Sequence, residues 1–96
     1  MNRTERKRIY RKALDLWGVN SQLGMLMEEC AELIQAVNKV IREDEPERWL
    51  HLAEEMADVQ IMIEQLQVII SWQCLEEKTA AAKEEKLARL RERVDR

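Results

Sequence analysis

Two pairs of acidic side chains lie inside segments that are otherwise strongly apolar. The first pair is Glu29 and Glu32, and the second is Glu55 and Asp58. Residues three apart on a helix are neighbours on its surface, so each pair could direct two oxygen ligands to one place. Hard cations such as Mg²⁺ prefer oxygen ligands. The spacing therefore predicts a metal site that is shared by two helices.

Burying several ionised carboxylates together is costly, and protonation, a basic partner or a cation can relieve that cost. Either pair taken alone is more typical of a solvated helix face. Two pairs on neighbouring apolar helices favour a divalent cation instead. Bound Mg²⁺ usually keeps several waters and completes its coordination shell with substrate phosphates. The pattern therefore indicates phosphate chemistry.

The periodicity of apolar residues predicts four helices. The first covers residues 4–17 and ends at Gly18, and Asn20 or Ser21 caps a second that runs to residue 42. Pro46 suits the first turn of a third helix over residues 46–72. A break between residues 71 and 78 precedes the last helix, which has a single apolar edge.

These helices present the acids on different faces. On the second helix the main apolar stripe centres on Cys30, with Glu29 and Glu32 on its flank. On the third helix Glu55 projects within the apolar stripe, with Asp58 beside it. That helix is apolar nearly all round, as expected for a helix that is buried on two sides. A chain of 96 residues can hardly cover both sides, so we expect a homodimer or a homotetramer.

Composition indicates one all-α domain over residues 1–96, because the chain has 36% charged and 46% hydrophobic residues, two glycines and no phenylalanine. Cys30 and Cys74 form no C-x-x-C pair, so we expect neither a disulfide nor a zinc site, and a reducing cytoplasm is the expected compartment. No apolar run predicts a signal peptide or a membrane span. The net charge of −3 speaks against nucleic acid as a partner.

Two segments resemble a known family. They are Glu28-Glu29-Cys30-Ala31-Glu32-Leu33 and Glu54-Glu55-Met56-Ala57-Asp58-Val59. Together they resemble the signature E-E-x-x-E followed by E-x-x-D of the all-alpha nucleoside triphosphate pyrophosphohydrolases. This MazG-like superfamily includes dimeric dUTPases and phosphoribosyl-ATP pyrophosphatase. The resemblance covers about residues 16–70, and residues 86–94 look like the basic closing helix of small, phage-type members.

The resemblance implies a four-helix MazG-like bundle that is completed by oligomerisation. It implies an enzyme that splits a nucleoside triphosphate between its α and β phosphorus atoms, giving the monophosphate and pyrophosphate, and so cleanses a nucleotide pool. Mg²⁺, with Mn²⁺ as an alternative, would supply charge neutralisation and an acidified water. The implied metal ligands are Glu29, Glu32, Glu55 and Asp58, and Glu28 would orient or deprotonate the attacking water.

Substrate-binding residues are predicted less directly. Lys39, Lys86 and Arg89 are the candidates for the phosphate groups, although solvated helix charges explain each of them equally well. Family members tend to stack the base on aromatic side chains, and this chain offers Trp17, Trp49, Trp72 and Tyr10. Trp17 is the best placed, just before the helix with Glu29. The lone His51 is better explained as a structural histidine than as a functional one.

Three other functions fit parts of the pattern. A non-enzymatic helical oligomerisation module explains the apolar third helix, would be indifferent to Mg²⁺, and gives no reason for the position of Glu55. Nucleic-acid binding could use the basic segment from Arg3 to Lys12, but the middle of the chain is acidic. A carboxylate-bridged di-iron bundle would need Glu-x-x-His pairs, which the chain lacks.

Overall fold

The computed structural model describes residues 1–96, except for the side chains of Ile69 and Trp72. Four α-helices and one short 3-10 helix make up the described part, which contains no β-strand. The predicted all-α class is therefore confirmed. Within the described residues, no helix is both long and apolar enough to cross a membrane. The elements are α1 (Arg3–Trp17), α2 (Val19–Arg42), α3 (Pro46–Ile69), the 3-10 helix η1 (Ser71–Gln73) and α4 (Leu75–Val94).

The ends of α1 follow ordinary capping chemistry. The side chain of Asn2 accepts a hydrogen bond from the Glu5 N–H at 2.9 Å. Gly18 ends the helix with φ of +84°, a conformation that glycine adopts without a side-chain clash. The same glycine is the N-cap of α2, which begins at Val19. The predicted caps Asn20 and Ser21 were therefore wrong, because one glycine serves both helices.

The end of α3 also differs from its prediction. Pro46 lies in the first turn as expected, but the α-helix ends at Ile69 and does not reach residue 72. Ile70 leaves the helical region, and Cys74 adopts a left-handed conformation with φ of +53°. The Cys74 N–H donates to the Ser71 carbonyl at 3.0 Å and closes the η1 turn. This turn begins at the start of the predicted interval, which confirms the position of the break.

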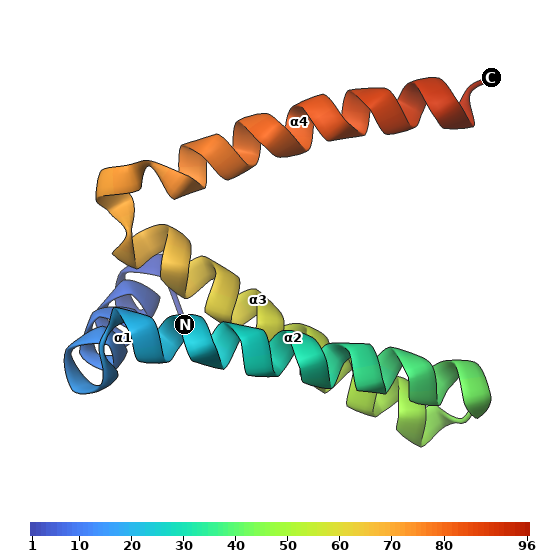
Figure 1. The fold of residues 1–96 in the computed structure, drawn as a ribbon, viewed down its shortest axis with the longest axis horizontal. Coiled ribbons are helices and arrows are strands. Elements are labelled where there is room, and N and C mark those ends of the chain that lie inside the picture. The colour runs from blue at the N-terminus through green and yellow to red at the C-terminus, as the bar shows by residue number, and fades with distance from the viewer.

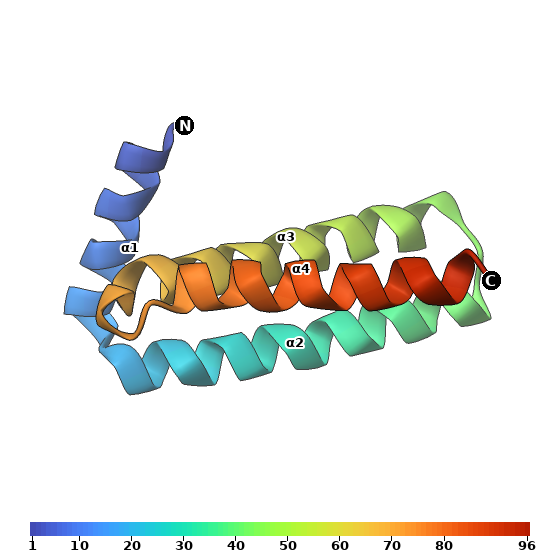
Figure 2. The same cartoon turned by 90° about the horizontal axis from the view of Figure 1, so that it is seen from above.

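The helices are arranged around an antiparallel pair. α2 and α3 lie side by side along their whole length, and α1 crosses one end of them (Figure 1). α4 diverges from this pair after its first turn, although it runs along the same direction when seen from above (Figure 2). Every residue of the chain from Glu77 to Arg96 is exposed. α4 is therefore anchored only near its start.

The buried core formed by the described side chains is small. Its apolar members are Tyr10, Ala36, Val59, Met62 and Val68. The α2 face that packs on α3 carries Gln22, Glu29 and Ala36, and Ala36 has no exposed surface. The predicted main stripe around Cys30 is turned partly outward, because α3 covers its flank instead. Its residues Leu23, Ile34, Val37 and Ile41 are exposed.

A polar cluster fixes α1 against α3. Arg6 Nε donates to Glu64 Oε1 at 2.5 Å, and the Tyr10 hydroxyl donates to the same oxygen at 3.1 Å. The bond from Arg6 holds the pKa of Glu64 below its usual value. Arg3 pairs with Glu76 of α4 at 2.7 Å. Two cations of the basic N-terminal segment are therefore occupied by acids of the same chain.

We expect the docking of α1 to depend on pH. The pKa of Glu64 is lower in the folded chain, so its contribution to stability is present above the unfolded value of about 4.5 and is lost as pH falls through the folded pKa. Thermal unfolding between pH 6 and pH 3 measures this. The melting temperature of the native chain should exceed that of Glu64→Gln at pH 6, and the difference should vanish towards pH 3. A difference that is constant with pH would contradict this assignment.

Candidate metal centre

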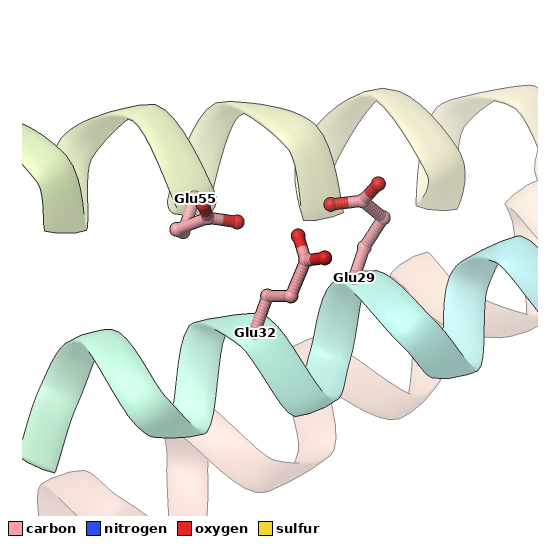
Figure 3. A group of neighbouring side chains, drawn as sticks. All are labelled: Glu29, Glu32 and Glu55. Carbon is pink, nitrogen blue, oxygen red and sulfur yellow. The ribbon is translucent and has the colours of Figure 1, made fainter.

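Three carboxylates meet between α2 and α3. Glu29 and Glu32 project from α2 and Glu55 projects from α3, and the three side chains converge on the space between the helices (Figure 3). One oxygen from each lies within 4.8 Å of the others. The local cause is helical spacing, because residues three apart on α2 lie on neighbouring positions of one face.

Burial makes this cluster electrostatically unusual. Glu55 is only 9% exposed, and Glu29 is half-buried. The Oε2 atoms of both residues are buried and have no hydrogen-bond partner in the described part of the chain. Burial is the main cause that raises the pKa of Glu29 and of Glu55, and the charges of Glu32 and Asp58 raise both further. The cluster therefore holds negative charge that the described side chains leave largely uncompensated.

Among the described side chains, His51 is the one cationic candidate that acts on Glu55. Its Nε2 lies 3.7 Å from Glu55 Oε1, and its Nδ1 lies 3.9 Å from Glu54 Oε2. His51 lowers the pKa of Glu55, but the effect of burial is larger and the net shift is upward. Among the described ion pairs, no lysine or arginine joins the three clustered acids. The preference for a structural His51 stays a prediction.

The donor set fits a hard divalent cation. Mg²⁺ binds oxygens at about 2.1 Å, so two of its ligands lie at most about 4 Å apart. Oxygens that lie within 4.8 Å of one another could reach such a geometry through small side-chain rotations. A cation there would also give a partner to the Oε2 atoms of Glu29 and Glu55, which have no hydrogen-bond partner among the described residues. Protonation of Glu29 or Glu55 is the alternative that their raised pKa values favour in the absence of metal.

Two other predicted acids lie at the margin of this cluster. Asp58 is exposed and outside the group of three, yet its charge raises the pKa of both Glu29 and Glu55, which places it nearby. Glu28 is exposed next to Glu29 along α2. Both are therefore accessible to solvent and to a ligand.

The predicted phosphate-binding cations are not gathered at the acids. Lys39 is half-buried towards the end of α2, about 10 Å along the helix from Glu32. Lys86 and Arg89 are exposed on the divergent α4, and Arg89 pairs with Glu85 at 3.0 Å. The structure of a single chain brings none of the three to the carboxylates, and their role stays a prediction.

An open cavity lies beyond the acidic cluster, towards α1. It measures about 340 Å³ and is lined by Trp17, Ser21, Gln22, Met25, Met62 and Gln65. Trp17 is 62% exposed, whereas the side chain of Trp72 lies outside what the structure describes. Neither Gln22 nor Gln65 was among the site residues predicted from the sequence. The available signal was a glutamine within the apolar run of α3 and another seven residues before Glu29.

Comparison of the chain with protein-family models, with curated proteins and with solved structures found no match. The resemblance of the two acidic motifs to the all-alpha pyrophosphohydrolases therefore stays a prediction from the sequence.

Proposed function

We infer that this chain is a Mg²⁺-dependent nucleoside triphosphate pyrophosphohydrolase of the all-alpha, MazG-like type. The observation that carries the proposal is the pair of buried, unpartnered carboxylate oxygens of Glu29 and Glu55, together with the converging Glu32. Stability alone gives no reason to retain such groups, because unpaired buried carboxylates destabilise a fold. The order and spacing of the two acidic motifs add the family resemblance.

The residues of the site have separable roles in this proposal. Glu29, Glu32 and Glu55 would hold Mg²⁺ with Asp58 beside them, and Mn²⁺ would satisfy the same oxygens. The cation, when bound, would neutralise phosphate oxygens and acidify a water. Glu32 and Asp58 are exposed, so triphosphate oxygens could approach from their side. Glu28 would accept a proton from the attacking water and hold it in line with the departing pyrophosphate.

Oligomerisation belongs to the same proposal. Many large apolar side chains are exposed in the single chain, including Ile34 and Ile41 on α2, Leu50 and Ile61 on α3, and Leu90 on α4. Faces of this kind mark interaction surfaces. A second copy would cover them and complete a helical bundle, as a homodimer or within a homotetramer, and it could bring Lys86 and Arg89 of α4 towards the phosphate groups.

Product analysis tests the activity. We expect the chain to convert at least one ribo- or deoxyribonucleoside triphosphate into its monophosphate and pyrophosphate in equal amounts with Mg²⁺, and to stop when the metal is chelated. Release of inorganic phosphate in place of pyrophosphate would contradict cleavage between the α and β phosphorus atoms. No turnover of any nucleotide in the panel would contradict the pyrophosphohydrolase.

The second candidate function is a non-enzymatic oligomerisation module. The observation that favours it is the exposed apolar edge of α4, formed by Leu87, Leu90 and Val94, which the single chain leaves uncovered. Such a module would assemble equally well with and without Mg²⁺. A metal-dependent change in its thermal stability would speak for the enzyme.

A further inference from the structure

The wall of the cavity beside the acidic cluster contains two buried glutamines that are hydrogen-bonded to each other. Gln65 Nε2 of α3 donates a hydrogen bond to Gln22 Oε1 of α2, and both side chains are only 4% exposed. In the described part of the chain neither amide makes a second side-chain hydrogen bond, and neither has an unpartnered atom that is fully enclosed. Both residues line the cavity. The N–H groups of Gln22 and the carbonyl of Gln65 are therefore the groups of this pair that a ligand in the cavity could engage.

The walls of this cavity suit a flat ring. Met25 and Met62 supply an apolar, adaptable surface, and the indole of Trp17 borders the opening with most of its surface exposed. An aromatic face offers stacking to any heterocyclic base. A purely apolar ligand would leave the N–H groups of Gln22 and the carbonyl of Gln65 without a further partner, which is unfavourable. The chemistry of the lining therefore favours a planar ring with a polar edge.

The cavity lies one to two helical turns away from the clustered carboxylates. Met25 precedes Glu29 by one helical turn, about 6 Å, and Gln22 precedes it by two turns, about 10 Å. On α3, Met62 and Gln65 follow Asp58 by one and two turns. A ribose with its α-phosphate spans a gap of that size. One nucleotide could thus reach both places.

We propose that the cavity is the nucleobase subsite of this chain and that the hydrogen-bonded pair Gln22–Gln65 reads the polar edge of the base. The proposal rests on the proposed pyrophosphohydrolase activity for its connection to the triphosphate, whereas base binding itself needs neither metal nor hydrolysis. The amide of Gln22 offers N–H donors and the carbonyl of Gln65 offers an acceptor. Discrimination between bases arises because a mismatched edge leaves these buried groups unpaired.

Binding of nucleoside monophosphates in the presence of chelator tests the subsite. We expect at least one ribo- or deoxyribonucleoside monophosphate to change the tryptophan fluorescence of the native chain. Trp17→Phe should lose this response, and Trp49→Phe should keep it, because Trp49 donates to Asp44 at 2.7 Å and lies outside the cavity. Gln65→Leu should weaken binding of the preferred base about tenfold, whereas Gln60→Leu, an exposed position on the same helix, should leave it unchanged.

A double variant separates recognition from folding. Gln65→Leu alone leaves Gln22 without its partner, whereas Gln22→Leu with Gln65→Leu replaces both amides by apolar groups and should fold as well as the native chain by circular dichroism. The double variant should bind all bases with similar affinity. The proposal would be overturned if the double variant still bound monophosphates in chelator with the base preference of the native chain. It would also be overturned if the native chain showed no response to any monophosphate. If the proposal fails in this way but the native chain still hydrolyses a nucleoside triphosphate, the proposed function stands and only the base subsite is wrong. If the native chain binds monophosphates as expected but hydrolyses nothing, the base subsite stands and the proposed function is wrong.

Discussion

Replacement of Glu55 by glutamine should abolish pyrophosphohydrolase activity and leave the metal-free fold intact or more stable. Glu55 lies in the buried stripe of α3, and burial raises its pKa, so the ionised form destabilises the folded chain at neutral pH. Glutamine keeps the shape without the charge. The same change removes one oxygen anion from the proposed metal centre, and we expect turnover to fall by about 10³-fold or more.

Two measurements on one preparation separate these effects. In chelator, Glu55→Gln should melt at the same temperature as the native chain or higher. With Mg²⁺, the native chain should gain thermal stability through binding, and the variant should gain much less. Glu54→Gln is the matched control, because Glu54 is its exposed neighbour and also lies near His51. Full activity in Glu55→Gln would remove Glu55 from the metal site.

The central part of this site was predictable because position on a helix follows directly from sequence spacing. Glu55 falls within an apolar stripe by its number alone, and the structure buries it. The ends of helices marked by backbone chemistry were also predictable, since Gly18 and Pro46 have few other roles in such a chain. The break after α3 could be predicted only to within several residues. The residue with the left-handed conformation there is Cys74, and a cysteine in a sequence does not indicate that conformation.

The choice of the buried face of α2 was not predictable from hydropathy. The stripe around Cys30 is the more apolar, but the face with Glu29 and Ala36 packs on α3. A helix with two apolar faces can turn either one inward, and small residues such as Ala36 allow a close approach of the neighbouring helix. The pairing of Gln22 with Gln65 was not predictable for a related reason. Glutamine on a helix is usually solvated, and only the pairing of α2 with α3 shows that both amides are buried together.

The second large effect concerns the apolar edge of α4. Leu87 and Leu90 are exposed in the single chain, and no residue from Glu77 onwards is buried against the α2–α3 pair. If a second copy covers this edge, the paired substitutions Leu87→Glu and Leu90→Glu should convert the oligomer into monomers. Each leucine buried in an interface contributes about 1.5–3 kcal/mol, and a two-fold symmetric interface counts every substitution twice. We therefore expect association to weaken more than about 100-fold.

Sedimentation velocity across a dilution series measures this shift, and activity measured in the same series links assembly to function. Ala81→Glu with Ala88→Glu is the matched control, because it adds the same charges to exposed positions of α4 that lie away from the apolar edge. The control should remain oligomeric. Loss of activity together with dissociation in the leucine variant would show that the site needs the second copy, as expected if α4 of the partner brings cations to the phosphates. A native chain that is monomeric at every concentration would contradict the proposed oligomer, and full activity in the monomeric variant would confine the site to one chain.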